Sequence, residues 1–230
     1  MPTIPPGQIM RPIVWDQDES GCAGERQFPC CGSIFLEEVT ETIAKEHVKP
    51  VILIFGPSGV GKSWLLEGLE GLEKTSFLCV HIDTDRPSGK FAANGFPADW
   101  DDDFNKVDFA HIVPVLRSRL AGSQSGAAMS FPTTYLFTAE RLTEAARLGA
   151  TPLVLWGARE HCVKAAEERI KKKKTRLVFD PVRYARQNDP TFVAYGLPDY
   201  DRFRVDAFSH DGSRYPWEEW VARLMKRIAG

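Results

Sequence analysis

The residues with the most chemical meaning form the octet Gly-Pro-Ser-Gly-Val-Gly-Lys-Ser at positions 56–63. The octet follows the apolar run at 51–55 and leads into a stretch with the apolar spacing of a helix. Glycines there let the backbone fold closely around an anion, and the helix adds the positive end of its dipole. The octet therefore predicts a P-loop, the motif that binds nucleoside triphosphates.

Each part of the predicted P-loop has an expected role. Lys62 would reach the β- and γ-phosphates, and Ser63 would ligate Mg²⁺. Backbone N–H groups of the loop and of the first helical turn would hold other phosphate oxygens. We expect the nucleotide to be held by Gly56, Pro57, Ser58, Gly59, Val60, Gly61, Lys62, Ser63 and Trp64.

Two carboxylates, Asp83 and Asp85, follow the next apolar run. The carboxyl ends of parallel strands line the ligand crevice of such sheets. Phosphoryl transfer needs Mg²⁺ to neutralise phosphate charge and a carboxylate to orient the attacking hydroxyl. We expect Asp83 and Asp85 to supply one role each. The alternative is that both are solvated acids that begin a polar turn, because aspartate is a common turn residue.

Short apolar runs alternate with helical patterns through most of the chain, which is typical of a parallel sheet between helices. We therefore expect an α/β fold with a doubly wound, five-stranded parallel sheet in residues 49–230. Residues 1–48 read as a partly mobile N-terminal extension with one helix near 33–46. Strands are predicted near 51–55, 77–83, 126–131, 151–156 and 203–208.

The composition limits the kinds of partner that we expect for this protein. The 230 residues are 43% hydrophobic and carry a net charge of −2, so no overall basic field favours nucleic acid. No apolar stretch has membrane-spanning length, and no secretion signal is evident, so we expect a cytoplasmic protein with a small-molecule substrate. Five irregularly spaced cysteines, among them Cys22, Cys30 and Cys31, favour neither a disulfide framework nor a zinc site.

The P-loop, the following apolar strand and Asp83-Thr84-Asp85 together resemble the shikimate kinase, gluconate kinase and nucleotide kinase group of small-molecule kinases. The resemblance implies ATP and Mg²⁺ as cofactors and transfer of the γ-phosphoryl group to a hydroxyl. It implies that Asp83 assists Mg²⁺ through water and that Asp85 holds the acceptor hydroxyl. It also implies that Arg169 lies on an arginine-bearing helix and that Asp211 and Gly212 belong to the loop that holds adenine.

The same resemblance implies a mobile lid near 176–198. We expect prolines 181, 190 and 198 to interrupt helix formation there, and at least one of Arg169, Arg176, Arg183 and Arg186 to stabilise phosphate charge during transfer. Two alternatives remain open. The arginines can be plain surface residues, and the segment can be a rigid subdomain packed through Tyr184, Phe192 and Tyr195.

The chain also departs from this group. The third strand lacks the glycine triplet of shikimate kinases, and the segment 94–104 is acidic and aromatic rather than arginine-rich. We expect it to favour a neutral, hydroxylated or cationic acceptor, unless it is only a solvated loop. Asn105-Lys106-Val107-Asp108 matches a guanine-reading motif but lacks the preceding apolar strand.

A nucleotide-binding regulator that acts through a protein partner is the alternative function. Such a regulator would show an exposed apolar patch instead of an acceptor pocket.

Replacement of Lys62 tests the P-loop directly. We expect Lys62→Ala to abolish ATP turnover while leaving the fold intact, because a lysine that serves phosphate contributes little to a core. Turnover would be measured by ADP release, and the fold by circular dichroism. Ordinary turnover in a folded Lys62→Ala variant would rule out the P-loop assignment.

Overall fold

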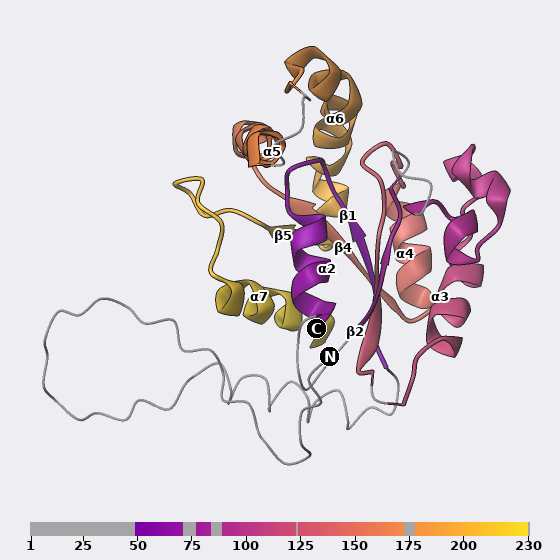
Figure 1. Cartoon of the computed structure of the whole chain (residues 1–230). Coiled ribbons are helices and arrows are strands. Elements are labelled where there is room, and N and C mark those ends of the chain that lie inside the picture. The colour runs from indigo at the N-terminus through magenta and orange to yellow at the C-terminus, as the bar shows by residue number, and fades with distance from the viewer. Residues whose placement is uncertain (1–48, 71–76, 84–88, 123, 173–177, 230) are drawn as a thin grey trace, which may run out of the picture.

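The computed structural model describes residues 49–70, 77–83, 89–122, 124–172 and 178–229. Five parallel strands form one sheet in the order β2-β3-β1-β4-β5, with β1 in the centre (Figure 1). This arrangement confirms the predicted doubly wound α/β sheet. The strands are β1 (Val51–Phe55), β2 (Phe77–His81), β3 (Gly126–Ser130), β4 (Ala150–Trp156) and β5 (Arg204–Asp206).

Helices cover both faces of the sheet, with α2 and α7 on one side and α3 and α4 on the other (Figure 1). None of the helices within the described ranges is long and apolar enough to cross a membrane. The α-helices are α2 (Lys62–Glu70), α3 (Phe109–Ser118), α4 (Ala139–Arg147), α5 (Arg159–Lys172), α6 (Pro181–Tyr195) and α7 (Trp217–Ala229). Short 3₁₀ helices are η2 (Ala92–Asn94), η3 (Ala98–Asp101), η4 (Phe104–Lys106) and η5 (Pro198–Tyr200).

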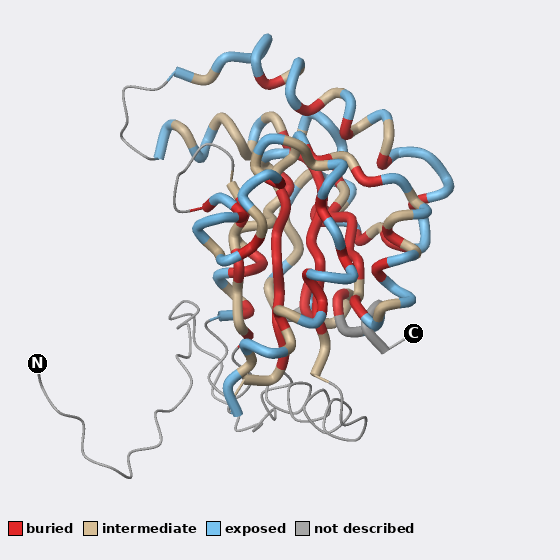
Figure 2. The backbone as a smooth tube through the Cα atoms, turned by 90° about the vertical axis from the view of Figure 1, so that its right-hand side faces the viewer, coloured by how far each residue is buried: buried red, intermediate tan, exposed pale blue. Residues whose placement is uncertain are grey.

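The sheet separates two hydrophobic cores. Alternate side chains of β1 point to opposite faces, so that Leu53 and Phe55 join the core under α3 and α4, while Ile52 and Ile54 join the core under α2 and α7. All five residues of β1 are buried, and the strands form the buried centre of the molecule in Figure 2. A central strand buried on both faces explains why its sequence is a continuous apolar run.

The acidic segment that the sequence suggested as an acceptor loop folds into η3 and η4. The Asp101 carboxylate accepts hydrogen bonds from the backbone N–H groups of Phe91, at 2.8 Å, and Ala92, at 3.3 Å. Asp99 forms an ion pair with Lys106 at 3.3 Å, and Asp103 caps η4. These three carboxylates therefore hold the local backbone together.

The guanine-like motif is also accounted for by helix capping. Asn105 and Lys106 lie in η4, and Asp108 is the N-cap of α3, where its side chain accepts a hydrogen bond from the Ala110 N–H at 2.8 Å. Aspartate at this position satisfies an otherwise unpaired helical N–H group. The residues of the motif thus have structural roles at the start of a helix.

The expected interruption of the 176–198 segment by proline is wrong. Pro181 occupies the first turn of α6, where its missing N–H costs nothing, and Asp180 caps the helix. Pro190 lies inside this 15-residue helix, and Pro198 begins η5. Tertiary packing compensates for the hydrogen bond lost at Pro190, because Tyr195 of α6 is buried in the core to 1% exposure.

The packing of α6 can be tested by a pair of substitutions. We expect Tyr195→Ala to lower the free energy of unfolding by about 3–5 kcal/mol, the range typical of removing a buried aromatic side chain. Val193, which is 72% exposed on the same helix, is the control, and Val193→Ala should change stability by less than about 0.5 kcal/mol. Urea denaturation would measure both, and equal effects would contradict the packing of α6 into the core.

Candidate nucleotide and acceptor site

The predicted P-loop connects the carboxyl end of the central strand to the start of α2. Gly56, Gly59 and Gly61 adopt positive φ angles, and the Leu65 N–H donates to the Gly61 carbonyl at 2.9 Å as the helix begins. The first N–H groups of a helix have no partner within it. This turn therefore has the backbone form that binds anions at a helix N-terminus.

Two of the glycines are required by close neighbours as well as by conformation. A Cβ atom on Gly59 would approach the Cys162 carbonyl oxygen of α5 to 2.1 Å, and one on Gly61 would approach the Arg214 guanidinium to 2.2 Å. Both positions also have φ values that favour glycine. The loop is thus packed tightly against α5 on one side and Arg214 on another.

Lys62 lies inside the turn. Its Nζ donates to the carbonyl oxygens of Gly56, at 2.6 Å, and Pro57, at 3.1 Å, and lies 3.3 Å from the Thr133 Oγ1. Burial lowers the pKa of the Lys62 ammonium to about 7, with a further lowering by Arg169 and an opposing effect of Asp83. The structure therefore brings Lys62, Asp83 and Arg169 within electrostatic range of one another.

The structure describes some of the other predicted metal and acceptor residues but not all of them. Asp83 follows β2, with its N–H bonded to the Gly89 carbonyl at 2.8 Å, and Ser63 lies half-buried in the first turn of α2. Asp85 and Arg176 lie outside the described residues, as do Cys22, Cys30, Cys31 and the whole of 1–48. Within the described ranges no three His, Cys, Asp or Glu side chains gather to hold a metal.

This donor set fits Mg²⁺ bound together with phosphate. Magnesium is usually held by one or two protein oxygen ligands and by substrate phosphates, rather than by a cage of protein carboxylates. The Ser63 hydroxyl, beside the phosphate-binding turn, and the Asp83 carboxylate, close enough to affect Lys62, are such ligands. The residues present therefore suit a Mg²⁺–triphosphate complex.

Trp64 of α2 packs against α7, and Asp211 stabilises the loop that precedes α7. The Trp64 ring meets Trp217 and Trp220 of α7 edge to face, at centroid distances of 5.2 and 6.0 Å, so its side chain is part of the packing between α2 and α7. The Asp211 carboxylate accepts from the Ser213 N–H at 2.9 Å and from the Ser209 and Ser213 hydroxyls, and these bonds lower its pKa to about 2. The Asp211 carboxylate therefore stabilises the conformation of the loop at 209–213.

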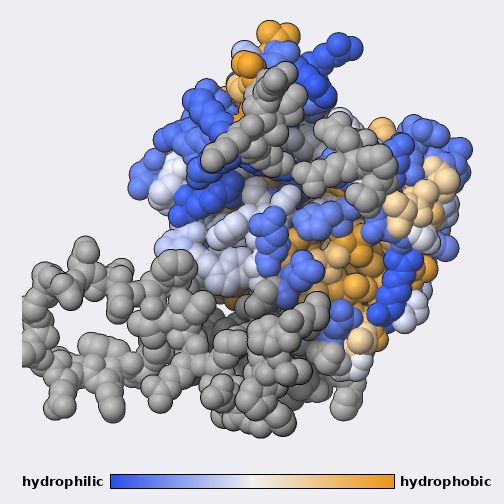
Figure 3. Space-filling model, viewed as in Figure 1, coloured by the Kyte–Doolittle hydropathy of each residue, from blue (hydrophilic) through white to orange (hydrophobic). Residues whose placement is uncertain are grey.

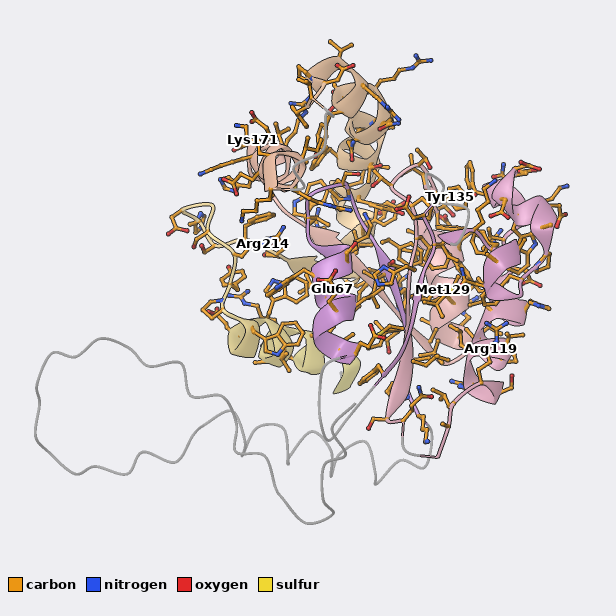
Figure 4. All side chains as sticks on the ribbon, in the orientation of Figure 1. Glu67, Arg119, Met129, Tyr135, Lys171 and Arg214 are labelled. Atoms are coloured by element: carbon orange, nitrogen blue, oxygen red, sulfur yellow. The ribbon has the colours of Figure 1, made fainter. Side chains whose placement is uncertain are left out.

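Sequence reasoning missed Arg214. Its guanidinium donates to the Gly59 carbonyl at 2.7 Å and to the Val60 carbonyl at 2.9 Å, and it lies over the Phe208 ring (Figure 4). Gly212 of the same loop approaches His161 of α5. The position of Arg214, two residues after Gly212 of the predicted adenine loop, was the sequence signal that could have indicated it. Its contact with the P-loop is seen only in the folded structure.

Sequence reasoning also missed the contact between α6 and the P-loop. The Ser58 N–H donates to the Asn188 side-chain oxygen at 2.7 Å, and the Tyr184 hydroxyl donates to the Ser58 carbonyl at 2.8 Å. Asn188 is only 1% exposed, so this is a buried polar contact. Thr191 of α6 donates to the Thr133 carbonyl at 3.0 Å. Helix α6 is therefore bonded to the turn and to the segment after β3.

A cavity of about 490 Å³ lies between α6 and the segment that follows β3. Thr133, Thr134 and Leu136 line it on one side, and Arg183, Arg186, Gln187 and Thr191 line it on the other. Thr133 also contacts Lys62 and lies 3.0 Å from the Ser58 hydroxyl. The cavity thus adjoins the P-loop through Thr133, and it contains two of the arginines that the sequence singled out.

Similarity to known proteins is found among solved structures. No protein family model matches the sequence, and no curated protein matches it. Among solved structures, a gluconokinase from Sinorhizobium meliloti 1021 is similar, with 20% identity over 79% of this chain and 92% of that chain and a TM-score of 0.48. A gluconokinase is one of the kinds of enzyme that the sequence resembles.

The lowered pKa of Lys62 predicts that nucleotide binding takes up a proton. Above pH 7 the empty site holds Lys62 mostly neutral, whereas phosphate charge would raise its pKa and keep it protonated in the complex. The association constant for Mg²⁺-ATP should therefore fall between pH 7 and 9, by at most about tenfold per pH unit for one proton.

Calorimetry in buffers of different ionisation enthalpy would measure this uptake. Lys62→Met is the control, since it lacks the titrating group and should bind more weakly at pH 7 without the same dependence on pH. Equal proton uptake in the two proteins would show that another group is responsible.

Proposed function

We propose that the protein transfers the γ-phosphoryl group of ATP to a hydroxyl of a small molecule. One observation carries the proposal: Thr133 contacts Lys62 of the P-loop and also lines a cavity of about 490 Å³. The proposed nucleotide site and a cavity large enough for a small molecule would therefore share Thr133. Phosphoryl transfer needs two such sites in contact, because catalysis depends on holding the two reactants in line.

The chain's own residues divide the work. Bound Mg²⁺-ATP would supply the transferable phosphoryl group. Lys62 and the N–H groups at the start of α2 would hold its phosphates, and Ser63 and Asp83 would hold the metal. Asp85 would orient the acceptor hydroxyl, a role that the resemblance to small-molecule kinases suggests. Arg169, which is close enough to lower the pKa of Lys62, would stabilise charge on the transferred group.

The cavity also separates the proposal from its alternative. A nucleotide-binding regulator would need an exposed apolar surface beside the nucleotide, to be recognised by a partner protein. The large exposed hydrophobic side chains of the described residues are Val178, Val182, Val193 and Leu197, in or beside α6. None of these four lines the cavity. The space beside the P-loop is bordered by arginine, threonine and glutamine side chains together with Leu136 and Pro190, and a concave, mainly polar lining favours a small-molecule substrate.

Asp85→Asn tests the assignment of roles. We expect this variant to reduce phosphoryl transfer at least 100-fold while the Kd for Mg²⁺-ATP changes less than about threefold, because the carboxylate is assigned to the acceptor. Transfer would be followed by ADP production against sugars, polyols, sugar acids and nucleosides, and affinity by calorimetry.

Controls separate the possible results. Lys62→Ala gives the background rate of ATP consumption, and Asp83→Asn should instead weaken binding that depends on Mg²⁺. If Asp85→Asn loses Mg²⁺-ATP affinity and keeps acceptor binding, the two aspartates exchange roles. Binding of Mg²⁺-ATP without acceptor-stimulated turnover across the whole panel would favour the regulator.

A further inference from the structure

We propose that Arg214 is a positioning residue for the nucleotide, because it holds two peptide groups of the P-loop by their carbonyl oxygens and so aims the N–H groups of Val60 and Gly61 at the phosphates. The inference rests on the nucleotide-binding part of the proposed function. It goes beyond that function, because Arg214 belongs neither to the P-loop octet nor to the lining of the cavity. The segment before α7 would thus determine affinity for phosphate.

The direction of these N–H groups follows from the geometry of the peptide bond. The Gly59 carbonyl shares a planar peptide group with the Val60 N–H, and the Val60 carbonyl shares the next one with the Gly61 N–H. In a trans peptide the C=O and N–H bonds point in opposite directions. The Arg214 guanidinium donates to the first carbonyl at 2.7 Å and to the second at 2.9 Å. Both N–H groups are therefore directed away from Arg214, across the turn.

A guanidinium suits this task better than other donors. Its N–H groups form a rigid planar fork, so Arg214 alone can bond both carbonyls. Its positive charge on the carbonyl side polarises the two peptide groups, which strengthens their N–H groups as donors. Successive N–H groups in a turn of this kind, with positive φ at Gly59 and Gly61, form a concave anion site. Arg214 would thus act through the backbone, without touching the phosphates.

The guanidinium is itself held on several sides. It lies 4.9 Å from the centre of the Phe208 ring and 5.8 Å from that of the Trp64 ring. The backbones of Phe208 and Arg214 form an antiparallel bridge, which places Arg214 between the loop before α7 and the start of α2 (Figure 4). Gly61 leaves the space that the side chain needs, since a Cβ atom there would lie 2.2 Å from it. Protein groups alone therefore fix the position of the guanidinium.

The loop that ends at Arg214 is fixed by its own hydrogen bonds. The Asp211 carboxylate accepts from the Ser213 N–H at 2.9 Å and from the Ser213 hydroxyl at 2.7 Å, and the Ser209 N–H donates to the Ser213 carbonyl at 2.9 Å. Figure 3 shows hydrophilic residues over α5 and over this loop. Polar contacts rather than apolar burial thus hold the loop, and Asp211 would support nucleotide binding indirectly.

Compounds that differ in their phosphate groups test the proposal by equilibrium binding. Calorimetry would compare Mg²⁺-ADP, Mg²⁺-pyrophosphate and adenosine. Arg214→Met keeps the length of the side chain but removes its charge and its donors. We expect this variant to bind ADP and pyrophosphate about tenfold to a hundredfold more weakly, the loss typical of one or two hydrogen bonds to a charged group, while the Kd of adenosine changes by less than about twofold.

A matched arginine serves as the control. Arg223 of α7 lies over the Tyr215 ring at 3.8 Å and pairs with Glu219 at 3.0 Å. Arg223→Met should leave all three affinities unchanged. Arg214→Lys keeps the positive charge without the planar fork, so it should lose part of the phosphate affinity. This conservative variant carries the test if circular dichroism shows that Arg214→Met does not fold.

Nuclear magnetic resonance would observe the two N–H groups directly. Binding of Mg²⁺-ADP should shift the amide proton signals of Val60 and Gly61 downfield in the natural protein, and replacement of Arg214 should remove most of that shift. A role confined to global stability would lower the unfolding midpoint without this change.

Three results would overturn the proposal. A folded Arg214→Met variant could bind ADP as tightly as the natural protein, it could lose adenosine and ADP affinity equally, or the Val60 and Gly61 signals could respond to ADP as before. Failure of the kinase function is distinguishable, since a protein that binds Mg²⁺-ADP through these N–H groups and transfers no phosphoryl group would keep the role of Arg214. If the natural protein bound neither ADP nor pyrophosphate, the nucleotide site and this proposal would both be wrong.

Discussion

The carbonyl oxygens of the P-loop turn need hydrogen-bond donors, and these donors come from the start of α2, from α6 and from the segment before α7. Lys62 donates to the carbonyls of Gly56 and Pro57, and Tyr184 of α6 donates to that of Ser58. Arg214 donates hydrogen bonds to the carbonyls of Gly59 and Val60. Buried carbonyl groups without partners would cost free energy, so these contacts stabilise the conformation of the turn.

These donors have an electrostatic consequence. Lys62 and Arg214 both lose water as they enter the site, and desolvation lowers the pKa of each. Arg169 acts on Lys62 in the same direction. Cations gathered at one end of a protein with a net charge of −2 create a local demand for negative charge, which a triphosphate would supply. An anionic ligand bound beside Lys62 would offset part of this desolvation.

Helix α6 couples the two halves of the proposed reaction. Its inner face contacts Ser58 and Thr133, and its adjoining face presents Arg183 and Arg186 to the cavity. The aromatic packing of Tyr184 and Tyr195 holds the helix against the core although Pro190 lies within it. A helix fixed in this way would set the distance between the proposed nucleotide and acceptor sites, and a movement of α6 would displace both contacts together.

Local sequence patterns were enough to predict the sheet and the P-loop turn. The buried run at 51–55 and the octet after it predicted β1, the P-loop and α2, because apolar periodicity and glycine spacing are local properties. The five strands were predicted within about two residues for the same reason. Asp83, Lys62 and Arg169 were also named from sequence, and the structure places them within electrostatic range of one another.

The residues that complete the turn from distant parts of the chain could not be predicted from local patterns. Asn188 and Arg214 lie 130 and 155 residues from their partners Ser58 and Gly59, and no local pattern marks them. The same holds for the partners of Asp99 and Asp101, which turned an acidic run into a folded segment. Local patterns report how a segment folds, whereas hydrogen-bond partners across the sheet depend on where the chain returns. That return is set by the packing of the whole domain.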